Sequence, residues 1–335
     1  MISVARQLLA VATVGLMAIS VTGCSTASAD AGSDVSASAS AESGTWPRTV
    51  THELGTTEIP SQPQNIVSTS LTITGTLLAI DAPVTASAAT SPGNGSDENG
   101  FFDQWSDVAA DRGLEVLYPD LEIDIESIIA AEPDLIVVST SGADSAAASY
   151  EALQDIAPTV VYNYGDKTWQ DLAAQLGEAT GLEANAESAA DEFDERVQEV
   201  AEKITVPEGD TNVIVYNGPE FQTAFAKPAG SHGTLLTSLG FNVVGAPDEL
   251  DGSETVRQDF AFLSLENTTT ALTAPTVFIV SGDDENKDML LNTEVLANAP
   301  AVASAAVYPL GDASFRIDYY SGLQIVDEIE TQFAG

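Results

Sequence analysis

The sequence is poor in cysteine, histidine and positive charge. Its 335 residues include one cysteine, two histidines and ten lysines and arginines, against 51 acidic residues. A single cysteine excludes a disulfide framework, a cysteine-built zinc site and a protein-held iron–sulfur cluster. Two histidines, His52 and His232, leave little for a three-histidine metal site. With so few cations, we expect neither nucleic-acid binding nor attachment to anionic lipid headgroups through a basic face.

The acidic excess gives the chain a formal net charge of −41. We interpret it as a solvated anionic surface that keeps an exported protein soluble and monomeric. Adaptation to high salt is an alternative that one sequence leaves open. Against this background, each remaining cation is a candidate for contact with an anionic ligand. The chain is 44% hydrophobic, and its length is sufficient to bury a core in two domains.

The first 23 residues have the pattern of a secretory signal peptide. Arg6 precedes an apolar run over residues 8–19, which is too short to span a bilayer. The segment 21–24, Val-Thr-Gly-Cys, resembles the lipobox of bacterial lipoproteins, in which the cysteine thiol receives a diacylglycerol. We predict that Cys24 anchors the exported protein to the outer face of the cytoplasmic membrane, on the periplasmic side or at the cell surface. An ordinary cleaved signal with an incidental cysteine is the alternative.

Residues 24–45 are rich in serine, alanine and glycine, and Val35 is their one large apolar residue. Such a segment cannot bury a core, so we predict a flexible tether. The remaining chain is predicted to form three parts. They are an N-terminal α/β lobe at 46–181, a linker helix at 182–206 and a C-terminal α/β lobe at 207–335.

Short apolar runs alternate with helical patterns throughout the two predicted lobes. This alternation is typical of α/β proteins with largely parallel sheets. Strands are predicted at 66–70, 134–139, 160–164, 212–216, 275–280 and 306–310. Helices are predicted at 146–156, 169–179 and 322–332.

Two parts of the chain resemble each other at an offset of 140 to 146 residues. Ile-Asp-Ile-Glu126 corresponds to Leu-Ser-Leu-Glu266, and Tyr162 corresponds to Tyr308. In both parts an apolar run is followed by Ala-Pro, a second apolar run and a Gly-Asp turn. We therefore predict duplicated lobes, with chance similarity of short motifs as the alternative.

Residues 182–204 contain neither glycine nor proline, and small or apolar residues recur there at helical spacing. At about 1.5 Å per residue, such a helix spans about 30 Å and can join two lobes. The predicted fold class is therefore α/β, with two Rossmann-like lobes joined by a single long helix. Two facing lobes place a ligand in the cleft between them, and one stiff connector predicts modest hinge motion.

Three longer segments carry a family resemblance. They are residues 66–84, residues 100–109 (Gly-Phe-Phe-Asp-Gln-Trp-Ser-Asp-Val-Ala) and residues 315–324 (Phe-Arg-Ile-Asp-Tyr-Tyr-Ser-Gly-Leu-Gln). They resemble the ferric-enterobactin-binding proteins, in the helical-backbone class of ABC-importer solute-binding lipoproteins, and the resemblance runs from about residue 46 to residue 329. It implies capture of an Fe(III)–siderophore complex, catecholate type favoured, and delivery to a membrane permease and its ATPase for iron uptake. It implies no cofactor and no chemistry on the ligand, with iron held by the siderophore.

A ferric tris-catecholate is anionic and has aromatic edges, so its pocket needs cations together with rings for stacking. Arg316 follows the turn after a predicted strand, with Tyr319 and Tyr320 beside it. It also matches the arginine in the family's Phe-Arg-x-Asp-Tyr-Tyr segment, which contacts ligand. A salt bridge to Asp312 or Asp318 is the alternative.

Three further residues complete the expected ligand contacts. Lys227 follows another strand-like run, Arg257 aligns with a family arginine, and Tyr216 ends a predicted strand. An equal alternative is that Arg257 is a solvated charge on a loop. Two family pocket residues, an arginine and a tryptophan, correspond here to Gly95 and Ala226, which puts the specific ligand in doubt.

Other residues are assigned structural roles. Trp105 and Trp169 are expected in the N-lobe core, because large aromatic side chains are usually buried. The acidic segment 283–288 is interpreted as a solvated loop, since it lacks the spacing of an EF-hand.

Other ligands and a different activity remain alternatives. Haem, cobalamin or another iron chelate could occupy the same fold, and haem would have to rely on a tyrosine or on His232. Ser-His-Gly at 231–233, however, has the pattern of a capped turn at a helix start. A surface hydrolase is the remote alternative, because the sequence has no Gly-x-Ser-x-Gly elbow and no glycine-rich phosphate loop. We predict that the protein is not an enzyme.

Overall fold

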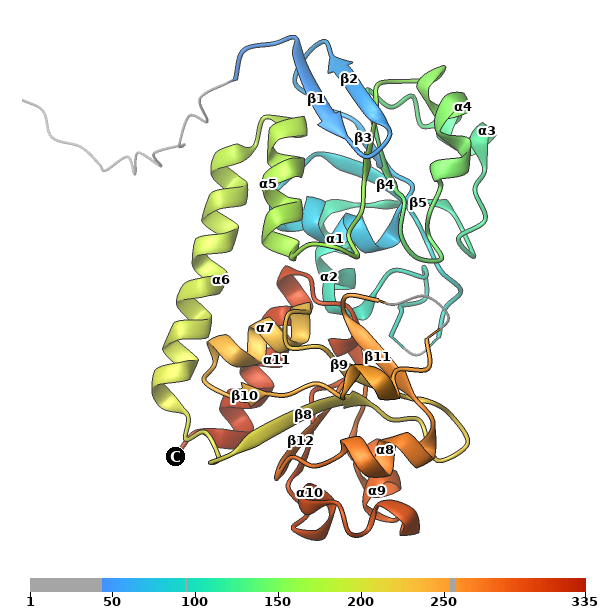
Figure 1. Ribbon diagram of the computed structural model, residues 1–335. Coiled ribbons are helices and arrows are strands. Elements are labelled where there is room, and N and C mark those ends of the chain that lie inside the picture. The colour runs from blue at the N-terminus through green and yellow to red at the C-terminus, as the bar shows by residue number, and fades with distance from the viewer. Residues whose placement is uncertain (1–43, 94, 254–256) are drawn as a thin grey trace, which may run out of the picture. The chain divides into compact units, whose positions relative to one another are not determined.

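The structure, a computed structural model, describes residues 44–93, 95–253 and 257–335. The predicted signal peptide, Cys24 and most of the predicted tether lie outside the described residues. Residues 41–335 belong to one compact unit. This unit contains two larger sheets flanked by helices, a separate two-stranded sheet and the long helix α6 (Glu183–Lys203). Figure 1 shows their arrangement. The predicted fold class is confirmed.

The N-lobe is built on a five-stranded parallel sheet. Its strands, in spatial order, are β5 (Glu115–Tyr118), β4 (Val84–Ala88), β3 (Ile66–Ser68), β6 (Leu135–Ser139) and β7 (Thr159–Tyr162). Its helices are α1 (Leu71–Ala79), α2 (Asp103–Arg112), α3 (Ile125–Ala130), η1 (Ala147–Ser149), α4 (Tyr150–Gln154) and α5 (Trp169–Thr180). The antiparallel hairpin of β1 (Arg48–His52) and β2 (Gly55–Ile59) packs against β7.

The C-lobe is built on a sheet of mixed direction. Its strands, in spatial order, are β11 (Phe260–Leu263), β9 (Thr223–Ala226), β8 (Asp210–Val215), β12 (Thr276–Ile279) and β13 (Val307–Pro309), and β10 (Asn242–Val243) also pairs with β8. Strands β8, β10, β12 and β13 are parallel, whereas β9 is antiparallel to both β8 and β11. The helical segments are α7 (Ser231–Ser238), η2 (Asp248–Leu250), α8 (Leu265–Ala271), α9 (Asp284–Leu291), η3 (Glu294–Leu296), α10 (Pro300–Ala303), η4 (Asp312–Phe315) and α11 (Tyr319–Phe333).

Central strands in both lobes are apolar on both faces. In β6, Leu135 and Val137 belong to one buried cluster, whereas Ile136 and Val138 belong to another on the opposite face. Such strands appear in a sequence as continuous apolar runs. This explains why all six predicted strands are present, as β3, β6, β7, β8, β12 and β13.

The segments that resemble each other occupy matching places in the two sheets. One includes the parallel pair β6–β7 and the other the parallel pair β12–β13. Each pair forms the last two strands of its sheet in spatial order, so β7 and β13 are both edge strands. The predicted helices correspond to η1 with α4, α5 and α11. The interpretation of residues 283–288 as a loop is wrong. Asp283 caps α9 through hydrogen bonds from the backbone N–H groups of Glu285 and Asn286, and Asp284 and Glu285 lie in the first turn of the helix, where its dipole favours negative charge.

Helix α6 joins the lobes and buries one stripe of its surface. The stripe contains Ala186, Ala189, Phe193, Val197 and Val200. The helix follows Gly181, whose φ of +74° ends α5, and it stops before Pro207. The C-terminal helix α11 packs against α6, and also against α1 and α2 of the N-lobe. The last helix of the chain therefore contacts both halves of the molecule.

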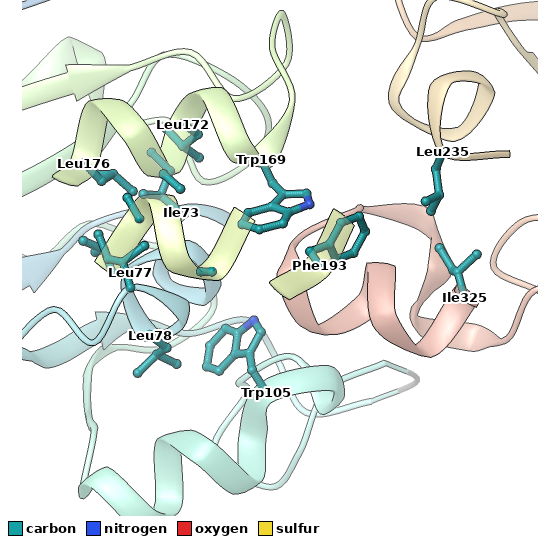
Figure 2. Close-up of a cluster of buried hydrophobic side chains, with 14 of the residues drawn as sticks. Ile73, Leu77, Leu78, Trp105, Trp169, Leu172, Leu176, Phe193, Leu235 and Ile325 are labelled. Carbon is teal, nitrogen blue, oxygen red and sulfur yellow. The ribbon is translucent and has the colours of Figure 1, made fainter. Parts of the chain in front are cut away.

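An aromatic cluster forms where α5, α6 and α11 meet. The rings of Trp169 and Phe193 are 5.1 Å apart, and those of Trp169 and Tyr319 are 5.5 Å apart. Figure 2 shows Phe193 beside Trp169, on the side facing Leu235 and Ile325 of the C-lobe. None of the helices in the described part of the chain is long and apolar enough to cross a membrane.

Candidate ligand-binding site

A cavity of about 610 Å³ lies between the two lobes. This volume is in the usual range for small-molecule sites, about 300–1,000 Å³. The N-lobe wall comes from the start of α1, the loop after β6, residues 163–168 after β7 and the start of α5. The C-lobe wall comes from the start of α7, residues 257–260 and residues 315–318. The N-lobe wall thus follows the carboxyl ends of parallel strands, as expected for an open α/β sheet.

Arg316 lines the cavity from the C-lobe. Its Nη1 donates a hydrogen bond to the Tyr164 hydroxyl at 3.0 Å, and its guanidinium lies 5.5 Å from the Tyr164 ring and 5.9 Å from the Phe315 ring. The salt bridge to Asp312 or Asp318 is not formed, and within the described residues no ion pair involves Arg316. Its positive charge is therefore not neutralised by a neighbouring carboxylate.

Arg257 also lines the cavity, but it is paired. Its Nε and Nη2 donate to the two carboxylate oxygens of Asp259 at 2.8 and 2.5 Å. Burial by itself raises the pKa of Asp259, but hydrogen bonds from Arg257 and from the backbone outweigh it and hold that pKa below its usual range. This bidentate pair fixes the guanidinium and cancels much of its charge.

Lys227 lies outside the cavity wall and supports the segment that carries Arg257. Its Nζ donates to the Arg257 carbonyl oxygen at 2.8 Å and lies 3.6 Å from a carboxylate oxygen of Asp251. Its backbone N–H donates to the Asp259 carbonyl oxygen at 2.8 Å. The structure therefore gives Lys227 an indirect position, behind the residues that face the cavity.

The three tyrosines expected at the site are not on the cavity wall either. Tyr216 is 1% exposed, lies in the core between β8 and the C-lobe helices, and shares a hydrogen bond of 2.7 Å with Thr293. Tyr319 belongs to the aromatic cluster with Trp169, and its ring is 5.2 Å from that of Tyr320. Trp169 is 6% exposed, as expected for a core residue, yet it also borders the cavity.

Lys167 lies on the N-lobe wall, but neighbouring carboxylates offset its charge. The Lys167 Nζ lies 2.7 Å from Asp166 and 3.6 Å from Glu53. Among the cations that line the cavity, Lys167 and Arg257 thus have carboxylate partners and Arg316 has none among the described residues. Among these three cations, the positive charge without a carboxylate partner is therefore at Arg316.

Sequence reasoning missed the aromatic part of the wall. The rings of Phe260 and Phe315 are stacked, with centroids 5.9 Å apart and an angle of 7° between planes, and both residues line the cavity. Tyr164 was also missed, although it ends a predicted strand, the same signal that singled out Tyr216. Phe260 had no such signal, because it starts an antiparallel strand that the apolar pattern did not reveal.

His232 borders the cavity instead of serving only as part of a capped turn. Helix α7 is capped by Gly230, which provides no side-chain hydrogen bond. The His232 ring is 5% exposed, and its Nε2 lies 2.7 Å from the Ser314 carbonyl oxygen. Burial lowers the pKa of His232, so the neutral ring donates its Nε2 proton to that carbonyl. One histidine is a poor basis for a metal centre, and within the described residues no group of three or more His, Cys, Asp or Glu side chains could hold a metal ion.

Comparison with known proteins identifies the family. Residues 66–313, which include both sheets, match the family described as periplasmic binding protein. This chain belongs to that family. The ferric enterobactin-binding periplasmic protein FepB of Escherichia coli (strain CFT073) is 42% identical over 298 residues, which cover 88% of this chain and 93% of FepB.

Two further proteins are similar to this chain. The crystal structure of holo-ViuP has a TM-score of 0.81 and 41% identity, and the match covers 87% of this chain and 97% of ViuP. The Fe(3+) dicitrate-binding periplasmic protein FecB of Escherichia coli is 28% identical over 202 residues, 59% of this chain and 63% of FecB. The family resemblance stated from sequence is confirmed. Because this family binds substrates for transport, the protein is a binding protein and not an enzyme, and the hydrolase alternative is set aside.

Proposed function

We propose that this protein captures a ferric siderophore outside the cytoplasm and delivers it to the permease and ATPase of an ABC importer, with a catecholate siderophore favoured. The observation that carries this proposal is the Arg316 guanidinium, which has no carboxylate partner among the described residues and lies beside the stacked rings of Phe260 and Phe315. A ferric catecholate presents anionic oxygens and aromatic faces, which these groups complement. The names of FepB and FecB, which specify ferric enterobactin and ferric dicitrate, support an iron chelate as the ligand class.

In this proposal, iron is coordinated by the siderophore and the protein contacts the outer surface of the complex. Guanidinium and phenylalanine side chains are not ligands for Fe(III). Tyr164 is the nearest phenol to Arg316, and burial together with the Asp144 carboxylate raises its pKa to about 12. Its hydroxyl therefore keeps its proton at neutral pH and forms hydrogen bonds with Asp144 and Arg316.

The proposal includes a lipid anchor at Cys24, which would hold the binding protein beside its membrane partner. The lipobox-like segment and the absence of any other cysteine support it. The test is metabolic labelling with a radioactive fatty acid in a host that expresses the full chain. We expect label and membrane association in the wild type and neither in Cys24→Ser; an unlabelled wild type would contradict the anchor.

The ligand is tested by fluorescence titration of residues 41–335, which form the compact unit. The probes are ferric enterobactin, a ferric trihydroxamate, ferric citrate, haem and cobalamin. We expect submicromolar quenching by the ferric tris-catecholate. Quenching by another ferric siderophore alone would keep the siderophore class and correct the type, whereas binding of haem or cobalamin alone, or of no probe, would overturn the proposal.

A further inference from the structure

A hydrogen-bonded series crosses the cavity and ends on Arg316. Arg316 Nη1 donates to the Tyr164 hydroxyl oxygen at 3.0 Å, and the same hydroxyl lies 2.7 Å from Asp144 Oδ1. Asp144 follows β6 and Tyr164 follows β7 in the N-lobe, whereas Arg316 follows β13 in the C-lobe. We call these three residues the interlobe link, because their hydrogen bonds connect the two lobes at the ligand site.

The link is anchored on a buried carboxylate. Asp144 is 5% exposed, and its Oδ2 accepts hydrogen bonds from Ser70 Oγ at 2.7 Å and from the Thr72 N–H at 2.9 Å. Both donors lie at the N-terminus of α1, where the helix dipole favours a negative charge. The carboxylate is thereby fixed to one of the most buried helices of the N-lobe.

Asp144 determines which way the Tyr164 hydroxyl points. A carboxylate can only accept hydrogen bonds, so the Tyr164 proton is directed to Asp144 and an oxygen lone pair faces Arg316. The raised pKa of Tyr164, about 12, keeps that proton in place at neutral pH. Tyr164 therefore fixes the guanidinium with a neutral oxygen and leaves its charge available, in contrast to the carboxylate partner of Arg257.

The backbone leaves room for this arrangement. Gly142 has a φ of +73°, and a Cβ built there would lie 1.8 Å from the Tyr164 hydroxyl oxygen and 3.0 Å from Asp144 Oδ1. Any side chain at position 142 would displace the hydroxyl or strain the backbone. The loop after β6 thus provides both the carboxylate and the space that the tyrosine occupies.

We propose that Asp144 and Tyr164 are positioning residues, which hold the uncompensated charge of Arg316 at the cavity and tie the lobes together around an anionic ferric chelate. This inference rests on the proposed function for the nature of the ligand. It assigns Tyr164 and Asp144 an effect that is exerted through Arg316.

The binding test is a double-mutant cycle with ferric enterobactin as the probe, or with whichever ferric siderophore of the panel binds. Tyr164→Phe keeps the ring and removes the hydroxyl, and we expect about a tenfold loss of affinity, the size of one hydrogen bond to a charged group. In an Arg316→Ala background the same change should cost less than about twofold, because its effect passes through Arg316. Asp144→Asn should follow the same pattern with a smaller loss.

Two binding outcomes would overturn the proposal. An unchanged affinity of Tyr164→Phe would show that the hydroxyl does not position Arg316. Equal losses in both backgrounds would show that Tyr164 contacts the ligand itself. Tyr150→Phe is the matched control, because it removes a hydroxyl near His52, away from the cavity wall; its affinity should equal that of the wild type.

A second measurement does not need a ligand. In thermal unfolding of the four ligand-free proteins of the cycle, Tyr164→Phe should lower Tm more in the wild type than in Arg316→Ala. Equal shifts would show that the link does not connect the lobes and would overturn the inference. A wild type that binds no ferric chelate would instead overturn the proposed function. The unfolding cycle would still show whether the interlobe link connects the two lobes.

Discussion

The two lobes share a strand frame but offer the ligand different chemistry. The N-lobe sheet is parallel throughout, and its wall provides hydroxyl, amide and aromatic groups together with a lysine already paired to carboxylates. The C-lobe sheet has the same parallel core but replaces one side by the antiparallel strands β9 and β11. The start of β11 pairs with the end of β9, at Phe260 and Ala226, which brings Arg257 and Phe260 to the cavity.

This difference shows how two lobes with the same strand order can contribute different groups to one ligand site. Both guanidiniums on the cavity wall come from the C-lobe, whereas the groups that hold Arg316 in position come from the N-lobe. In the proposed site, charge and positioning come from opposite sides of the cleft, so we expect binding of an anion to depend on both lobes. The following predictions test this division, from the largest expected effect to the smallest.

The largest effect is expected where the lobes are joined. Phe193 is 3% exposed and packs against Trp169 and Tyr319. Phe193→Ala should lower the free energy of unfolding by about 3–5 kcal/mol, because it leaves a cavity between three helices. Denaturant unfolding measures this, with Phe221→Ala as control, since Phe221 is 63% exposed and its loss should cost less than about 0.5 kcal/mol. Similar losses for both variants would show that Phe193 does not join the lobes.

The next effect separates the two lobes by charge. Arg316→Ala should weaken binding of an anionic ferric siderophore by about ten- to a hundredfold, as expected for an uncompensated charged hydrogen-bond donor. Lys167→Ala should weaken it by less than about threefold, because its charge is already paired. Titration of both variants with the same siderophore checks the contrast. Equal losses would contradict the assignment of the free charge to the C-lobe.

A smaller effect sharpens the contrast between the two arginines. Asp259→Asn removes the charge that neutralises Arg257 while keeping the shape of the side chain. Affinity for an anionic ferric siderophore should rise by about two- to fivefold, the scale of one partly exposed ion pair. A neutral ferric trihydroxamate serves as control and should bind without change. Weaker binding of the anionic siderophore would contradict this prediction and would mean that Asp259 is needed to orient Arg257.

The smallest effect is a pH dependence of stability from the C-lobe side of the cavity. Burial lowers the pKa of His232, so the unfolded chain binds a proton at a higher pH than the folded protein does. Stability from this group is present above the unfolded pKa of about 6.5 and is lost as the pH falls below it.

Thermal unfolding between pH 7 and pH 5 measures this dependence. Tm should fall more steeply for the wild type than for His232→Gln. His52 is also buried with a lowered pKa and contributes in the same direction, so the slope should decrease further in the variant lacking both histidines. Identical slopes in wild type and His232→Gln would contradict the prediction.

The sequence predicted the longer apolar strands and the long helix, and it missed several short strands. Strands β6 and β12 are continuous runs of large apolar residues, and α6 has an unbroken helical pattern over its length. Strand β4, Val-Thr-Ala-Ser-Ala, and strand β9, Thr-Ala-Phe-Ala, are short and rich in small residues. Their pairing depends on neighbouring strands, which local patterns do not contain.

Side-chain direction explains why some site residues were placed correctly and others were not. Tyr216 and Ile214 are two residues apart, and both lie in the core between the C-lobe sheet and its outer helices. Because side chains alternate along an extended strand, a shift of one residue would have pointed Tyr216 the other way. For Lys227, position after a strand was predicted correctly, but its Nζ turns to the Arg257 carbonyl oxygen instead of to the cavity.

The sequence by itself determined the fold class, the long connecting helix and the family, and it named Arg316 as a candidate, because these depend on periodicity, on length and on the types of residue present. Only the tertiary structure decided which cations are neutralised, that Tyr164 and Asp144 hold Arg316 from the opposite lobe, and that Phe260 stacks with Phe315. Tyr164 and Arg316 are 152 residues apart in the chain, and Phe260 and Phe315 are 55 residues apart. Contacts between such distant segments are set by sheet order and lobe packing, which no local pattern of residues specifies.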